Sequence, residues 1–204
     1  MKTLSLGLLF AIFSSVASAH EMRPSVASLS VDSQGTLTLE LVTNMEAWIA
    51  NIDPSLSDTD DSPNAGHYDQ LRALGTNALV EAIKKGERDI TQAIEIVAGG
   101  GRVGMSLIAI EVLPVDDINL PRDTRLTLGG ELPDGVSSLV YRVHETLPNT
   151  AVRLFLENAD PVVQFVGSGR SSDALSLDQA VQRSVGALVA EYLVLGFTHI
   201  IPKG

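Results

Sequence analysis

Alternation of apolar and polar residues is the feature that most narrows the folds open to this chain. Ser25–Val31 and Thr36–Val42 both alternate, and a turn-forming stretch at 32–35 lies between them. A period of two places every second side chain on one face of a strand. Two such runs around a short polar turn predict a β-hairpin. Three leucines of the second run are expected to face the core: Leu37, Leu39 and Leu41.

Several further runs extend this pattern along the chain. Thr91–Ala98 and Arg102–Leu113 predict a second hairpin, joined by glycines 99–101 that adopt positive φ at little cost. Further strands are expected at Arg125–Leu128, Ser138–His144, Ala151–Leu156 and Val162–Val166. Roughly seven or eight short strands at this spacing indicate an antiparallel sandwich or barrel. We expect a mainly β fold with an immunoglobulin-like β-sandwich, and the periodicity leaves the strand order open.

One internal stretch has helical spacing instead. Apolar residues recur through Tyr68–Lys85, and Gly75 and Gly86 are suited to break or end helices. The preceding stretch, 51–65, is rich in Asp, Ser and Pro and is expected to be a loop. We therefore expect a helical insertion at about 66–88 within a β-rich domain that spans 20–167.

The N-terminus has the pattern of a secretory signal peptide. Lys2 precedes an apolar run, Leu4–Phe13, and small residues follow at 17–19. The apolar run is shorter than the roughly 20 residues that cross a bilayer. We expect cleavage after Ala19, which makes residues 1–19 the signal peptide and His20 the first mature residue.

Charge and cysteine content narrow the partners of the exported chain. Loss of residues 1–19 removes one lysine and no acid, which leaves 13 basic side chains against 25 acidic ones and a net charge of −12. Nucleic acid and anionic membrane surfaces bind clustered Lys and Arg, so we expect neither as a partner of the exported chain. The chain has no cysteine, which excludes disulfides and thiolate chemistry and leaves stability to the core.

The C-terminal part changes in composition again. Residues 168–183 begin with a polar, glycine-containing stretch and are expected to be a linker. Val185–Ile201 then contains Glu191 as its only formally charged side chain. A core helix is one interpretation, but we favour the start of a membrane region at 184–204, which makes membrane lipid a partner of this segment.

The two ends of the chain resemble a known family. A mature start at His20-Glu21-Met22-Arg23-Pro24, a β-rich exported domain, and a C-terminal run of Gly196-Phe197-Thr198-His199-Ile200 followed by Lys203-Gly204 are similar to the HupE/UreJ family of membrane proteins. In that family the run continues with Leu-Asp-His and further transmembrane helices. The resemblance implies a protein of the cell membrane with an extracytoplasmic, periplasmic domain. It also implies a role in the transport of nickel or another divalent metal, since relatives are regarded as nickel permeases.

Two histidines are the candidate metal ligands. An imidazole in a membrane segment is costly and is a functional candidate, and imidazole binds Ni, Cu, Zn and Fe, which points to His199. Glu191 lies about two helical turns earlier and either shares a face with His199 or extends to the interface. His20 would carry a free α-amine beside its imidazole and could chelate Cu(II) together with His67 or His144. The alternative for His20 is a solvated terminal residue.

The other motifs in the sequence are too incomplete to predict a metal site or a catalytic site. The acidic residues Asp53, Asp58, Asp60 and Asp61 resemble the start of a calcium loop, but Pro63 and Asp69 stand where glycine and glutamate are needed. We therefore expect a solvated loop. His144-Glu145 lacks the second histidine of a zincin helix, and neither a nucleophile elbow nor a phosphate loop occurs. We expect no enzymatic activity and no firmly indicated cofactor. Trp48 is expected to pack in the core.

Two functions remain open from the sequence. The first is the extracytoplasmic domain and first membrane segment of a metal transporter, in which the β domain collects or gates ions for His199. The second is a membrane-anchored module that binds other envelope proteins through sheet edges or inserted helices.

Overall fold

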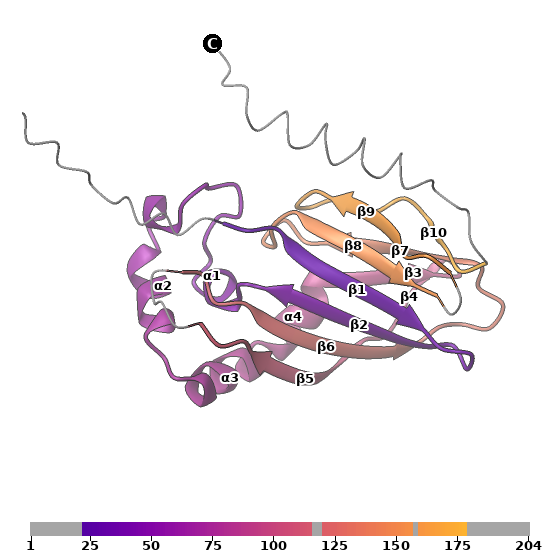
Figure 1. Cartoon of the computed structure of the whole chain (residues 1–204), viewed down its shortest axis with the longest axis horizontal. Helices are drawn as coiled ribbons and strands as arrows, with labels where there is room; N and C mark the ends of the chain where they lie inside the picture. The colour runs from indigo at the N-terminus through magenta and orange to yellow at the C-terminus, as the bar shows by residue number, and fades with distance from the viewer. Residues whose placement is uncertain (1–21, 116–119, 157–158, 179–204) are drawn as a thin grey trace, which may run out of the picture.

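Two β-sheets form the body of the protein in the computed structural model (Figure 1), which describes residues 22–115, 120–156 and 159–178. The larger sheet has the order β5-β6-β2-β1-β8-β9. Its strands are β1 (Ser25–Val31), β2 (Thr36–Thr43), β5 (Ser106–Val112), β6 (Thr124–Glu131), β8 (Thr150–Phe155) and β9 (Val162–Val166). The smaller sheet has the order β10-β7-β3-β4. Its strands are β3 (Ile94–Ala98), β4 (Gly101–Arg102), β7 (Ser138–Val143) and β10 (Leu175–Ser176). The expected mainly β fold with helices is confirmed for these residues.

The first hairpin is confirmed in both its strands and its register. β1 and β2 pair antiparallel, with Leu29 opposite Leu39. In the turn, the Asp32 carboxylate accepts the backbone N–H groups of Gln34 and Thr36 at 2.8 and 2.9 Å. These bonds stabilise the charged carboxylate and lower the pKa of Asp32.

The core lies between the two sheets and is built from the inward faces of the strands. The three leucines of β2 expected in the core, Leu37, Leu39 and Leu41, are buried, which confirms that prediction. Tyr141 of β7 is buried on the opposing sheet. Burial in this apolar environment raises the pKa of the Tyr141 phenol well above its usual value.

One strand pair departs from the expected antiparallel arrangement. β1 pairs with β8 in parallel, with Ala27 opposite Val152 and Leu29 opposite Leu154. The expectation of antiparallel sheets is therefore wrong for this pair, while the other strand pairs of the described residues are antiparallel. A parallel partner comes from a distant part of the chain, so alternation within β1 carries no information about it.

The second hairpin forms only at its tip. Gly99 and Gly100 have positive φ and turn β3 into β4, with Val97 opposite Arg102. After Arg102 the chain leaves the smaller sheet and enters β5 of the larger one, so the predicted long strand from Arg102 to Leu113 is wrong.

A glycine makes this change of sheet possible. The 103–105 segment passes against β6 at Gly130, where an added Cβ atom would lie 2.6 Å from the Gly104 carbonyl oxygen and 2.7 Å from the Met105 sulfur. Any larger side chain would push the two segments apart. Gly130 therefore permits the close approach by which the chain crosses between the two layers.

The helical insertion is present and begins earlier than predicted. Its elements are α1 (Met45–Ile49), the 3-10 helix η1 (Thr59–Asp61), α2 (Ala65–Arg72), α3 (Thr76–Lys85) and α4 (Glu87–Ala93). α1 starts directly after β2 because the Asn44 side chain caps it, accepting the Ala47 N–H at 3.0 Å. Residues 91–93, expected at the start of a strand, belong to α4. Buried residues of α3 and α4, including Leu79 and Ile90, join the core that the two sheets share.

Part of the expected linker at 168–183 belongs to the sandwich. β10 pairs with β7, and Leu175 is buried in the core. Ser172 accepts the Tyr141 N–H through its hydroxyl and donates its own N–H to the Tyr141 carbonyl. The predicted signal peptide and membrane segment lie outside the described residues. Within the described residues, no helix has the length and apolar composition needed to cross a membrane.

Candidate functional site

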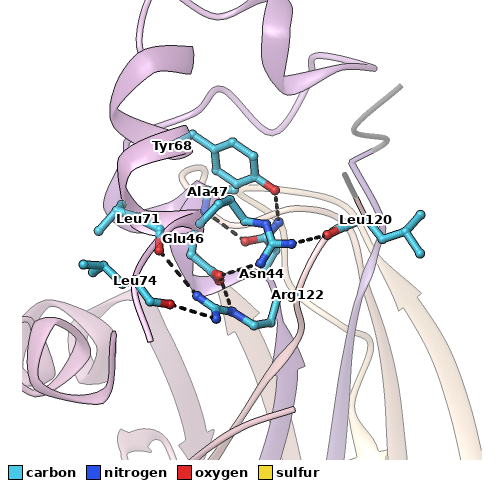
Figure 2. A network of polar contacts seen from close by, with 9 residues as sticks. Asn44, Glu46, Ala47, Tyr68, Leu71, Leu74, Leu120 and Arg122 are labelled. Carbon is cyan, nitrogen blue, oxygen red and sulfur yellow. Dashed lines mark hydrogen bonds and ion pairs between the residues drawn. The ribbon is translucent and has the colours of Figure 1, made fainter. Parts of the chain in front are cut away.

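A cluster of buried charges lies where the helices meet the larger sheet (Figure 2). We call it the Glu46 cluster; it consists of Glu46 in α1, Arg72 at the end of α2 and Arg122 just before β6. These residues are 0, 5 and 9% exposed. Glu46 Oε1 accepts a hydrogen bond from Arg122 Nε at 2.7 Å and lies 3.4 Å from Arg72 Nη1. One carboxylate oxygen thus holds two guanidinium groups.

Backbone carbonyls take up further guanidinium hydrogens. Arg122 donates to the carbonyl oxygens of Leu74 and Leu71 at 3.1 and 3.4 Å, and Arg72 donates to that of Leu120 at 2.6 Å. These carbonyls belong to the end of α2, the turn after it and the connection that enters β6. The cluster therefore ties together segments that are far apart in the sequence.

A second pair of polar side chains lies beside the cluster. Asn44 donates its side-chain N–H to the Tyr68 hydroxyl at 3.2 Å, while its oxygen caps α1. Tyr68 is buried. Desolvation by burial is the main cause that raises the pKa of the Tyr68 phenol, although the Asn44 hydrogen bond acts in the opposite direction. The phenol is therefore neutral at physiological pH.

The chemistry of the Glu46 cluster suits a structural role. Arginine does not lose its proton under ordinary conditions, and all three side chains are shielded from solvent. Glu46 Oε2 has no hydrogen-bond partner among the described residues, so Oε1 makes both contacts of the carboxylate with the guanidinium groups. Because its three buried side chains bind one another and the backbone of separate segments, the cluster orders the helices.

Sequence reasoning singled out none of these three residues. Glu and Arg side chains are mostly exposed in proteins, and Arg72 and Arg122 stand near Asp69 and Asp123 in the sequence, so they look like ordinary surface charges. Glu46 lies within Met45-Glu46-Ala47-Trp48-Ile49. That apolar surrounding was the one available signal for a buried carboxylate.

His144 is committed to local hydrogen bonds. Its Nδ1 accepts the Thr146 N–H at 3.3 Å, so the neutral ring carries its proton on Nε2. Thr146 Oγ1 lies 3.1 Å from the same nitrogen and accepts the Trp48 indole N–H at 3.2 Å. A metal ion at Nε2 would require the other tautomer and the loss of the Thr146 N–H bond. His144 is therefore a poor partner for His20.

Trp48 packs against the core, which confirms its expected role. Beside it lies an apolar cavity of about 10 Å³. Its lining residues are Leu41, Met45, Trp48, Ile90, Ala93, Ile94, Leu126 and Leu147. A volume of this size holds a single water molecule at most, so the cavity is a packing defect and not a ligand site.

The acidic loop uses its carboxylates locally. Asp53 accepts the Ser55 N–H at 2.8 Å, which lowers the pKa of Asp53, and Asp58 accepts the Asp60 N–H at 2.9 Å. Among the described residues, no group of three or more His, Asp and Glu side chains is placed to hold a metal ion. The candidate ligands His20 and His199, together with Glu191, lie outside the described residues.

Comparison with known proteins identifies no relative: neither a protein family nor a curated protein matches this chain. The functional argument therefore rests on the residues themselves.

Proposed function

We propose that this chain is the extracytoplasmic domain and first membrane segment of a HupE/UreJ-like membrane protein that takes part in nickel or other divalent metal transport. The observation that carries the proposal is the C-terminal run Gly196-Phe197-Thr198-His199-Ile200 with Lys203-Gly204, which resembles the first membrane segment of that family. The signal-like N-terminus supports export of the domain to the periplasmic side of the cell membrane.

Within this proposal the metal contacts fall to the ends of the chain. His199 is the proposed ligand in the membrane segment, with Glu191 as a second polar group two turns away. His20 is the proposed ligand at the mature N-terminus, through its amine and imidazole. The sandwich between them offers His144 in a tautomer that does not favour metal binding and an exposed His67 on α2.

A specific observation favours the second candidate function, a membrane-anchored interaction module without transport activity. The outward residues of the larger sheet, such as Ser30 and Glu40, are exposed or half-buried and are available to a partner protein. We also propose that the sandwich is immunoglobulin-like. Its two facing sheets support that fold, although the parallel β1–β8 pair differs from the all-antiparallel sheets that define it.

Metal titration of the full-length mature chain in detergent tests the proposal. Ni(II), Cu(II), Zn(II) and Co(II) are each titrated calorimetrically into the wild type, His199→Ala, and a variant with one extra residue before His20. His144→Ala is the matched control, since it removes an imidazole whose Nδ1 accepts the Thr146 N–H and which is a poor partner for His20. Weaker binding in either test variant but not in the control supports the metal role. Absence of binding to all four ions in the wild type contradicts it and leaves the interaction module.

Export and membrane attachment are tested separately. N-terminal sequencing of the protein recovered from the envelope is expected to begin at His20. Alkaline carbonate washing is expected to leave the chain in the membrane fraction. An intact Met1 start or release by the wash would contradict the proposed location.

A further inference from the structure

The larger sheet has one face that the rest of the described sandwich does not cover. Figure 1 shows β1, β2 and β6 in front, with β3, β4 and α4 behind them. The buried residues of these front strands alternate with exposed or half-buried ones, which point to the outer face. The exposed positions include Ser30 of β1 and Glu40 of β2.

Charge divides this outer face into two halves. The outward positions of β2, β5 and β6 carry three acids and one base: Glu40, Glu111, Glu131 and Arg125. The outward positions of β1, β8 and β9 carry one charged residue, Arg153. In a chain with 25 acidic and 14 basic residues, the second half is thus free of acids along its described strands.

Large apolar side chains gather on that same half. Phe155 of β8 is 42% exposed and Phe165 of β9 is 40% exposed, and the partly buried Val163 lies opposite Arg153 on the neighbouring strand. We call Arg153, Phe155, Val163 and Phe165 the β8–β9 patch. Two phenylalanines this exposed on neighbouring strands form an apolar surface that is a candidate contact site.

We propose that the β8–β9 patch rests on the surface of the membrane that carries this chain, with Phe155 and Phe165 in the headgroup region and Arg153 on lipid phosphates. This inference rests on the proposed membrane attachment. Aromatic side chains favour the membrane interface, and the guanidinium group of arginine donates hydrogen bonds to phosphate oxygens, which zwitterionic headgroups also carry. The acidic half of the face offers these phosphates carboxylates in place of donors, which sets the orientation of the sheet.

Chain length permits this contact. Six residues, 179–184, lie between Asp178, the last described residue, and the start of the apolar run at Val185. An extended chain from Asp178 to Val185 spans at most about 25 Å, so the domain is held close to a bilayer that contains the run. Such tethering raises the effective concentration of the patch at the surface, and two phenylalanines then suffice for a contact that would be weak in a free domain.

The absence of cysteine makes a site-specific probe possible. Ser30→Cys and Ser106→Cys each introduce a single thiol at an exposed serine on the outer face. Both lie on one row of the sheet: Ser30 pairs with Phe155 and Thr38, while Thr38 and Ser106 both pair with Gly129. Ser30 borders the patch, and Ser106 lies three strands away on the acidic half, about 14 Å along the sheet.

Each thiol is labelled with a polarity-sensitive fluorophore, and the mature chain is reconstituted into phosphatidylcholine vesicles that contain headgroup nitroxide lipid. The label at position 30 is expected to shift to shorter wavelength and to be quenched several-fold more than the label at 106. Phe155→Ser with Phe165→Ser, and separately Arg153→Glu, should bring the quenching at 30 down to that at 106. Ile108→Ser is the matched control, because Ile108 is an exposed apolar residue on the other half.

Co-sedimentation with the vesicles separates this inference from the proposed attachment. A chain that sediments while both labels remain equally exposed to water overturns the patch but not the attachment. A chain that stays in the supernatant overturns both. Shielding of position 30 in detergent, without a bilayer, would identify residues 185–201 or a second copy as the occupant and would also overturn the inference.

Discussion

Glu46→Gln is the sharpest test of the buried cluster. The change keeps the size of the side chain and removes the charge that holds Arg122 at 2.7 Å and Arg72 at 3.4 Å. At an effective dielectric constant of about 20, each attraction at such distances is worth about 4 kcal/mol. Relief of the carboxylate's own desolvation returns several kcal/mol. We therefore expect the free energy of unfolding to fall by about 3 kcal/mol, near the lower end of the range for breaking a buried ion pair.

Urea unfolding followed by the fluorescence of Trp48, the one tryptophan of the chain, measures this change. Trp48 packs against the core two residues from Glu46, so its emission reports the region concerned. The matched control is Glu81→Gln, which breaks an exposed pair with Lys84 at 2.8 Å on α3. Exposed pairs contribute about 0–1 kcal/mol, so the control should unfold almost as the wild type does.

If Glu46→Gln and Glu81→Gln lower the unfolding midpoint equally, the buried charges of the Glu46 cluster do not stabilise the fold as expected. A second variant tests the same charges, because an ion cluster can often be replaced by apolar residues of similar volume without loss of stability. The triple variant Glu46→Leu, Arg72→Met and Arg122→Met should recover most of the stability that Glu46→Gln loses. A triple variant less stable than the single one would mean that the carbonyl hydrogen bonds, and not the charges, dominate.

The remaining predictions concern backbone approach, a turn and the indole. Gly130→Ala should destabilise the protein by about 1–3 kcal/mol through overpacking at the sheet crossing, whereas Gly66→Ala, whose added Cβ meets nothing within 4 Å, should raise the urea midpoint. Carboxyl NMR should give Asp32 a pKa below its pKa in the unfolded chain. The charged carboxylate then stabilises the fold at pH values above the unfolded-state pKa, and this stabilisation is lost as the pH falls through the folded-state pKa. A pKa at the usual value would contradict the turn geometry. Trp48→Phe should lower the free energy of unfolding by about 1 kcal/mol more in the wild type than in a Thr146→Val background, because the hydrogen bond to Thr146 is lost only in the wild type. Circular dichroism follows this unfolding, since the change removes the one tryptophan.

Alternation located most strands because it reports which face of a strand is buried. β1 and β9 match their predicted bounds, and β2 differs by one residue. Strand partners are a different kind of information. β1 takes β8 as a parallel neighbour although more than a hundred residues separate them, and nothing in the local period of either strand encodes that choice.

Short elements and buried charges were harder to foresee for separate reasons. α1 has five residues, too few for a helical period to be visible, and its one local signal is the capping residue Asn44. The Glu46 cluster joins Glu46 to Arg72, which lies 26 positions later in the sequence, and to Arg122, which lies 76 positions later. A periodic pattern does not connect such positions, so the pairing becomes visible when α1, α2 and the connection into β6 are packed together.

The position of the cluster also explains how the insertion and the sheet are kept in register. α2 and the connection before β6 meet at Glu46, which lies in α1, the helix that follows β2 after the capping residue Asn44. β2 and β6 are neighbours in the larger sheet, so the cluster lies at the end of the pair that it helps to align. Apolar contacts alone tolerate small shifts of one segment past another. A carboxylate between two guanidinium groups does not, because a shift would leave a buried charge unpaired. The charges thus fix where the helical insertion docks, while the buried leucines of β2 and β6 belong to the apolar core that the sheets share.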